Sequence, residues 1–272
     1  MVALLFIAHH SCCAGKGVGG KETPCTPDTP ISELLRKAQL PARPDASDYA
    51  RMITCLSIAV SKGKTAGPES DAFLHTAYSN LALAYFETQR FEDAENTLRA
   101  REQAGIALDA DGHMMLCAIV ERRSMGNWAK VAACYKRAAK SGVKPALAFV
   151  GQALQKQNDF EGAAKYYQKA VKAQPADGNL RKNYGAVLRR LGENAAALRQ
   201  YEYVVEKNSL DVAGWMGLGK SLFDAGAPLK ARDAFESALR TCGVSPSPKR
   251  YLPSITTTYC CCCCYYYYYC SY

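Results

Sequence analysis

Long apolar runs are missing from this 272-residue chain. None approaches the roughly 18–20 consecutive apolar residues that a helix needs to cross a bilayer, so the sequence predicts no transmembrane segment. Proline is confined to the joints between segments and the two ends, while Ala, Leu, Lys, Arg, Gln and Glu dominate the middle. This composition favours helices, and 49% hydrophobic with 22% charged residues is sufficient for a packed core.

Paired cysteine motifs are missing as well, because residues 31–245 contain no CxxC spacing although the chain has 13 cysteines. Cys55, Cys117, Cys134 and Cys242 are isolated in helical segments, where cysteine behaves as a small buried hydrophobic residue. Most of the others lie in the terminal run that ends the chain. These placements predict a reduced, intracellular type of chain without a disulfide or zinc framework, and hence a cytoplasmic location.

Catalytic and cofactor-binding patterns are absent too. His75 and His113 stand alone at helix starts, with no nucleophile or paired carboxylate at helical spacing. The stretch GKGVGGKE (15–22) has Glu22 where a phosphate-binding loop requires Ser or Thr to hold magnesium. HHSCC (9–13) offers adjacent ligand types that rarely close one tetrahedral metal site. The sequence therefore predicts no enzymatic activity, no cofactor and no metal site.

The formal net charge of +9 attracts acidic partners of some kind. The positive excess is spread over helical segments rather than collected in a tail. No run rich in Lys and Arg interleaves with stacking aromatic residues, so nucleic acid is not the predicted partner.

The middle of the chain repeats itself at a period of 34 residues. Five columns of the self-alignment agree across three registers. They are Gly151, Gly185 and Gly219; Leu154, Leu188 and Leu222; Ala163, Ala197 and Ala231; Tyr167, Tyr201 and Phe235; and Ala170, Val204 and Ala238. Internal repetition at this period indicates a solenoid.

Each unit contains the pattern of two helices. In the first unit of the alignment, apolar or small residues from Leu147 to Leu154 mark one helical face, and QND (157–159) then breaks the pattern before a second helix. Glycine inside a helix costs roughly 1 kcal/mol against alanine. We expect Gly151 to face the second helix of its own hairpin, where a missing side chain lets the backbones approach and Tyr167 fills the space between hairpins.

The stretch WMGLGKSLFDAGAPLKARDAFESAL (215–239) resembles the tetratricopeptide repeat (TPR) family. The matching residues are Trp215, Leu218, Gly219, Ala231, Phe235 and Ala238, with Leu222 in place of the usual tyrosine. The resemblance implies an all-α fold, a right-handed α-solenoid of stacked helix-turn-helix repeats. The predicted units span residues 31–66 (degenerate, with its turn at 41–48), 75–108, 112–143, 144–177, 178–211 and 212–245.

We accordingly predict one TPR-like domain over residues 31–245. Residues 1–30 form a disordered or targeting segment, in which MVALLFIA leaves a secretory signal over residues 1–14 as an alternative to a cytoplasmic protein. Residues 246–272 form a low-complexity tail rich in Cys and Tyr. A translated microsatellite explains this tail, and a redox-active or metal-binding tail is the alternative.

In the TPR family the first helices line a concave groove in which a ligand peptide usually lies. The resemblance therefore implies that groove-facing positions bind the partner. The candidates are Gln152, Gln155, Lys156, Asn179, Lys182, Arg189 and Lys220. Their cations suit a carboxylate-bearing or acidic segment, and a merely solvated basic face is the alternative. Under the groove hypothesis, Lys182→Glu with Arg189→Glu should abolish partner capture and leave melting unchanged.

The family serves as a general protein-binding scaffold, so the predicted function is a non-enzymatic adaptor that binds a protein partner in this groove. The alternatives are RNA binding by a related helical-repeat array and a docking subunit of a multiprotein enzyme complex. A standard Hsp70/Hsp90 clamp is not expected, because Ala148 and Gln152 stand where the clamp requires Lys and Asn. Partner identity and oligomeric state stay open.

Overall fold

A computed structural model describes residues 24–41, 43–63 and 71–243. Regular structure in these ranges consists of twelve α-helices and no strand, which confirms the all-α class. No helix within the described ranges has the length and apolar character needed to cross a membrane. The predictions for residues 1–23 and 244–272, including the secretory signal and the Cys/Tyr-rich tail, lie outside the described part. The domain limits stay a prediction.

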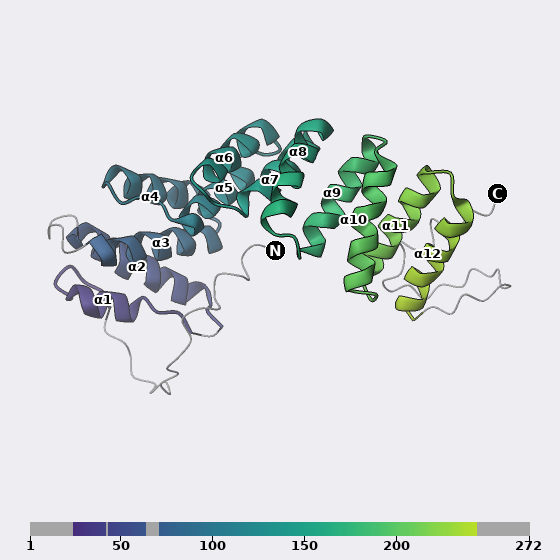
Figure 1. Ribbon diagram of the computed structural model, residues 1–272. Helices are drawn as coiled ribbons and strands as arrows, with labels where there is room; N and C mark the ends of the chain where they lie inside the picture. Colours follow the sequence, from purple (N-terminus) through teal and green to yellow (C-terminus); the bar gives the residue numbers. More distant parts are fainter. Residues whose placement is uncertain (1–23, 42, 64–70, 244–272) are drawn as a thin grey trace. The chain divides into compact units, whose positions relative to one another are not determined.

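The helices follow one another as helix-turn-helix pairs (Figure 1). In chain order the pairs are α1 (Ile31–Lys37) and α2 (Ala46–Gly63), α3 (Asp71–Glu87) and α4 (Phe91–Gln103), α5 (Ala110–Arg123) and α6 (Trp128–Lys140), α7 (Ala146–Lys156) and α8 (Phe160–Ala173), α9 (Gly178–Arg190) and α10 (Asn194–Lys207), α11 (Val212–Asp224) and α12 (Pro228–Thr241).

The chain divides into two compact units, residues 1–77 and 78–272, and the division falls inside α3. In the first unit α2 begins at Ala46, within the turn that was predicted for residues 41–48. Asp45 is the reason, because its Oδ1 accepts hydrogen bonds from the backbone N–H groups of Ser47 (2.8 Å) and Asp48 (3.0 Å). A carboxylate in this place satisfies amide groups that have no partner within the helix.

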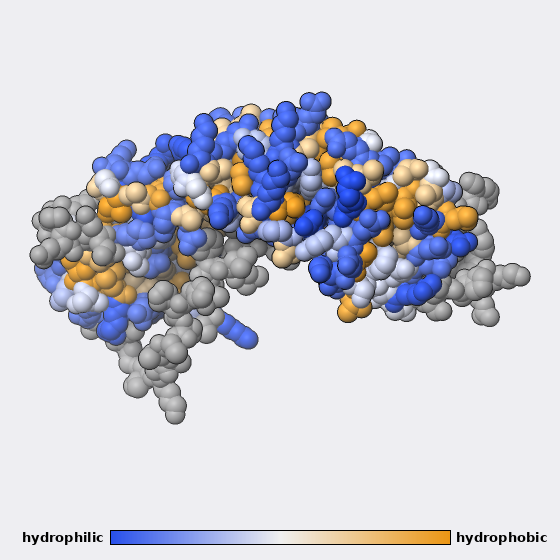
Figure 2. Space-filling view, viewed as in Figure 1, coloured by the Kyte–Doolittle hydropathy of each residue, from blue (hydrophilic) through white to orange (hydrophobic). Residues whose placement is uncertain are grey.

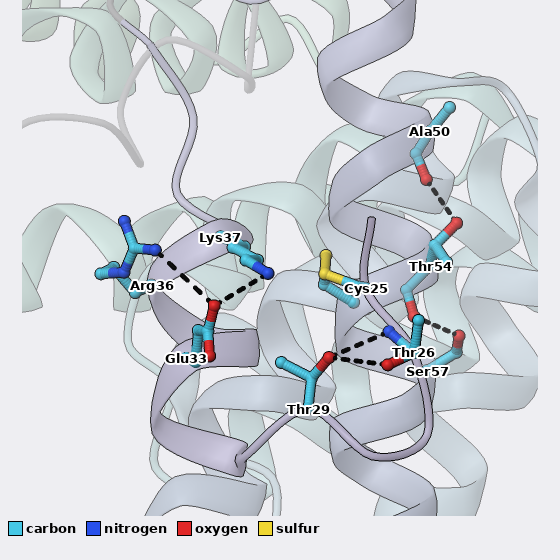
Figure 3. The surroundings of a disulfide bond; sticks show 10 residues. Cys25, Thr26, Thr29, Glu33, Arg36, Lys37, Ala50, Thr54 and Ser57 are labelled. Atoms are coloured by element: carbon cyan, nitrogen blue, oxygen red, sulfur yellow. Dashed lines mark hydrogen bonds and ion pairs between the residues drawn. A yellow bond between two sulfur atoms is a disulfide. The ribbon is translucent and has the colours of Figure 1, made fainter. Parts of the chain in front are cut away.

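The segment before α1 is fixed to α2 by Cys25–Cys55, whose Cα atoms lie 5.3 Å apart. Figure 3 shows Cys25 together with Thr26 and Thr29, and the Thr26 backbone N–H donates to Thr29 Oγ1 at 3.1 Å. The Lys62 ammonium group, on α2, donates to the Thr29 carbonyl at 2.8 Å. One covalent and one polar contact therefore hold residues 25–29 against the same helix.

The structure corrects the interpretation of the isolated cysteines. Cys55, Cys117 and Cys134 are buried, as expected, but they are not unpaired, because Cys25–Cys55 and Cys117–Cys134 are disulfides. Cys117 lies on α5 and Cys134 on α6, and their Cα atoms are 5.5 Å apart because the two helices pack as a hairpin. A search for CxxC spacing misses partners that are 17 and 30 residues apart in sequence.

In the second unit the glycines of the first helices face the second helix of their own hairpin, as predicted, but they contact its aromatic ring, which was expected between hairpins. A Cβ atom placed on Gly151 would lie 3.0 Å from the Tyr167 ring, and one on Gly185 would lie 2.8 Å from Tyr201. All three column glycines are buried. The missing side chain therefore provides the space that each ring fills.

Rings also fill the space between neighbouring hairpins. Tyr135 on α6 stacks on Phe149 of α7, with ring centroids 4.9 Å apart and planes inclined by 17°. The Tyr201 ring faces Gly185 of its own hairpin and Gly217 of the next one, where an added Cβ would overlap it. Offset aromatic pairs and close ring–backbone contacts thus join one pair of helices to the next.

The QND break between α7 and α8 has a local cause. Asn158 adopts a left-handed conformation with φ of 62°, which ends the first helix, and asparagine tolerates this region better than most residues. Asp159 then accepts a hydrogen bond from the Gly162 N–H at 2.8 Å and so caps α8. The two residues reverse the chain in a turn short enough for the helices to pack antiparallel.

Candidate partner-binding surface

The seven residues predicted for partner binding lie on three successive first helices of the second unit. We call them the first-helix surface: Gln152, Gln155 and Lys156 on α7, Asn179, Lys182 and Arg189 on α9, and Lys220 on α11. None is fully buried, and Gln152, Lys156 and Asn179 are exposed. Figure 2 shows hydrophilic side chains alternating with hydrophobic ones over the visible face of this region.

Two of the predicted cations form ion pairs with the next repeat. Lys182 Nζ lies 2.6 Å from Asp211 Oδ2, and Arg189 Nη1 lies 2.8 Å from Asp224 Oδ2. Both acids belong to the hairpin of α11, so these pairs join α9 to its neighbour. The charges of Lys182 and Arg189 are therefore compensated within the chain, and the side chains contribute to repeat stacking.

Asp211 has a second role, because its Oδ1 caps α11 by accepting a hydrogen bond from the Gly214 N–H at 2.8 Å. Burial alone raises the pKa of Asp211. The hydrogen bond and charge of Lys182, together with backbone N–H groups at the start of α11, outweigh burial and hold this pKa below its usual value. The carboxylate is thus ionised at neutral pH, as the ion pair requires.

The ion pairs change one expectation for the variant Lys182→Glu with Arg189→Glu. Each reversal would place a carboxylate against Asp211 or Asp224 at the contact between α9 and α11. Like charges at this distance repel, so melting should not stay unchanged. Loss of partner capture by this variant would then have two explanations, and a test of the surface needs cations outside the stacking contacts.

The other predicted residues are less involved in packing. The Tyr167 hydroxyl donates to Gln155 Oε1 at 3.4 Å, and Lys156 Nζ lies 6.0 Å from the centre of the Trp128 ring. Gln152 and Asn179 are exposed on α7 and α9. Their side chains are placed to meet a ligand without first leaving a strong contact.

Sequence reasoning missed Asp211 and Asp224 as partners of the surface cations. A usable signal was present, because the pairs are separated by 29 and 35 residues, close to the repeat period. A cation and an acid at such a spacing lie on equivalent parts of neighbouring hairpins. Deciding whether their side chains touch still required the helix-to-helix distance, which the period does not give.

Within the described residues, no group of three or more His, Cys, Asp or Glu side chains is arranged to hold a metal ion. The histidine and cysteine stretch at residues 9–13 and the terminal cysteine run lie outside these residues.

A family model for the tetratricopeptide repeat matches residues 120–178, 150–201 and 185–246. These matches include the stretch 215–239 that carries the resemblance. The helical-repeat solenoid expected from the sequence is confirmed. The chain contains tetratricopeptide repeats within residues 120–246.

Solved structures of tetratricopeptide repeat proteins are similar in fold. YrrB, described as a TPR protein with an unusual peptide-binding site, is 20% identical over 61% of this chain and 84% of its own, with a TM-score of 0.53. MamA is 15% identical over 66% and 98%, with a TM-score of 0.55. A repeat protein from Parabacteroides merdae is 15% identical over 80% and 81%, with a TM-score of 0.57. No curated protein matches.

Proposed function

We propose that this protein is a non-enzymatic scaffold that binds a segment of a protein partner through the first-helix surface. The observation that carries the proposal is the exposure of Gln152 and Lys156 on α7. Arg190, which follows Arg189 at the end of α9 and is also exposed, is added here to the first-helix surface. In the described part of the chain, Gln152 and Arg190 form no side-chain hydrogen bond or ion pair. Exposed amide and cationic groups on packed helices are suited to hydrogen-bonding an extended peptide.

The chemistry of these side chains favours an acidic or carboxylate-bearing segment. Hydrogen bonds in which the donor or the acceptor is ionised are roughly twice as strong as neutral ones. Lys156 and Arg190 are the cations to which we assign this role, because Lys182 and Arg189 are paired with aspartates. The similarity in fold to YrrB, a protein described as having a peptide-binding site, supports a peptide ligand on this type of solenoid.

The test is affinity capture from native lysate with the variant Lys156→Glu/Arg190→Glu. Reversing both charges should remove the partner that the unchanged protein retains, because the variant repels an acidic segment. The matched control is Lys140→Glu/Lys172→Glu, which reverses two exposed lysines on the second helices α6 and α8. Circular dichroism should show equal helix content for all three proteins.

Two outcomes would contradict the proposal. If the Lys156→Glu/Arg190→Glu variant captures the same partner as the control variant, the partner does not bind through the first-helix surface. If treatment with ribonuclease removes the captured material, RNA binding by a helical-repeat array becomes the better interpretation. Submicromolar retention of random RNA on filters at physiological salt would support that second interpretation independently.

The compartment is a second proposal. The expectation of a cytoplasmic location depended on unpaired cysteines, and the two disulfides remove that ground. Disulfides form and persist in oxidising compartments and are rare where glutathione and thioredoxin keep thiols reduced. We therefore propose that the chain folds in an oxidising compartment.

Thiol alkylation at the moment of lysis tests this proposal on the protein from its natural source. Peptide mass spectrometry without reduction should recover peptides joined through Cys25–Cys55 and through Cys117–Cys134. Reduction before alkylation is the control and should yield the four separate alkylated peptides. If all four thiols are alkylated without reduction, the chain works in a reducing compartment and the proposal is wrong.

A further inference from the structure

The second unit contains a cleft of about 470 Å³ between α8 and α9. One wall is the face of α8 that carries Glu161 and Ala164, and the other is the face of α9 that carries Tyr184 and Leu188. Leu191 and Glu193, in the turn after α9, close one end. This volume lies in the range of sites that hold a small ligand or a single large side chain.

A small residue on α8 accounts for the cleft. In the next repeat, 34 residues later, the position of Ala164 is occupied by Leu198, which is half-buried and packs against the core cluster of Leu188 and Leu218. Ala164 lacks the three additional carbon atoms that fill the corresponding space between α10 and α11. The joint between α8 and α9 thus lacks the side chain that fills the next joint.

The floor of the cleft is apolar and its end is acidic. Leu188 is 1% exposed, and Leu191 is half-buried beside it. Because α8 and α9 are joined by a short turn and run antiparallel, Glu161 at the start of α8 lies at the same end as Glu193. Within the described residues neither glutamate forms an ion pair. The rim also carries Lys165, and the charge of Arg199 reaches Tyr184, so the two carboxylates are accompanied by two cations.

Tyr184 adds an aromatic face and a hydrogen-bond donor. Burial is the main cause that raises the pKa of Tyr184, the charge of Glu193 raises it further, and Arg199 opposes both. The hydroxyl therefore stays protonated at neutral pH. An aromatic ring beside two carboxylates is an arrangement that favours a planar cation over an anion or a neutral group.

We propose that this cleft accepts an arginine side chain from the protein partner, and the proposal rests on the scaffold function proposed above. The aliphatic stem would pack on Ala164, Leu188 and Leu191, and the guanidinium group would meet Glu161, Glu193 and the Tyr184 ring. Arginine fits better than lysine, because its planar fork pairs with carboxylates in a bidentate manner and stacks on aromatic faces. The cleft and the basic first-helix surface would then bind different parts of one ligand.

The test is a titration of the isotopically labelled full chain with N-acetyl-arginine methylamide, followed by amide chemical shifts. Saturable shifts are expected at Leu188, Leu191 and Glu193. The citrulline analogue has nearly the same shape without the charge and should bind at least about tenfold more weakly. The lysine analogue should fall between the two.

Two variants make the result specific. Ala164→Leu introduces the residue that the next repeat already carries and should abolish the shifts by filling the cleft. Glu161→Gln/Glu193→Gln keeps shape and volume and should weaken arginine binding, followed at the Leu188 and Leu191 amides, while free-protein shifts change only near the two substituted positions. The second variant keeps the test valid if the first one folds poorly.

Equal shifts with citrulline, unchanged binding by the Glu161→Gln/Glu193→Gln variant, or no saturable shift at these amides would each overturn the assignment. Failure here is distinguishable from failure of the scaffold proposal. Partner capture that is lost in Lys156→Glu/Arg190→Glu but retained in Ala164→Leu would leave the scaffold function standing and exclude the cleft.

Discussion

Replacing Gly217 with alanine is expected to destabilise the second unit by about 1–2 kcal/mol, measured by urea denaturation. The new Cβ would overlap the ring of Tyr201, and overpacking of this kind costs about 1–3 kcal/mol or more. The ring has little room to retreat, since a Cβ on Gly185 on its other side would already lie 2.8 Å away. Alanine's better helix propensity returns only about 1 kcal/mol.

The matched control is Gly178→Ala on α9. A Cβ there would meet only Val204, at 3.9 Å, which is ordinary van der Waals contact. This substitution should be neutral or slightly stabilising. If the two alanine variants unfold at the same urea concentration, the close contact between Gly217 and Tyr201 does not exist in the folded protein.

Replacing Arg101 with alanine is expected to cost about 2–4 kcal/mol, because it truncates a fully buried side chain, and this lowers the melting temperature of a unit of this size by about 10 °C. The side chain is 0% exposed. Its Nη2 donates to the Ala107 carbonyl at 2.7 Å, its Nη1 donates to Ser79 Oγ at 2.9 Å, and Asp109 lies 3.5 Å away. Truncation would remove these contacts and leave a cavity where the buried Arg101 side chain lies.

The repeat columns alone would predict the opposite result for Arg101→Ala. Arg101 occupies the column that holds Ala138, Ala170, Val204 and Ala238 in the other hairpins. If the column simply favours small residues, alanine should be tolerated or even stabilising. The control is Arg99→Ala in the same helix, which removes a half-exposed ion pair with Glu95 and should cost under about 1 kcal/mol. An Arg101→Ala variant as stable as this control would contradict the assigned role.

Much of the fold was predictable from the sequence because it depends on local, repeated patterns. Gly151, Gly185 and Gly219 coincide at a fixed period, and so do the rings that face them, so the columns identify both the helices and their contacts. Because the same residue pair recurs in three units, its agreement is not a chance feature of one unit. The columns thus predicted which residues pack together, but the sequence analysis expected Tyr167 between hairpins rather than against Gly151 of its own hairpin.

The features that escaped prediction are those that occur once. Cys117–Cys134 and Cys25–Cys55 join single residues whose distance depends on how two particular helices cross. The ion pairs of Lys182 and Arg189 needed the separation of α9 and α11, to within the length of a side chain. In the sequence Ala164 is an ordinary helical alanine. Its role becomes apparent only when the structure shows that Leu198, at the equivalent position of the next repeat, fills the corresponding space. Such features depend on three-dimensional distances that a repeat period leaves undetermined.

The central claim is that rings packed against glycines stabilise the repeats, within each hairpin and, at Gly217 and Tyr201, between successive hairpins. A double-mutant cycle between Gly217 and Tyr201 measures this contact directly. Gly217→Ala should cost at least about 1 kcal/mol less in a Tyr201→Leu background than in the unchanged protein, since the smaller side chain makes room for the new methyl group. An identical cost in both backgrounds would show that the two residues do not interact, and the proposed basis of repeat stacking would be wrong.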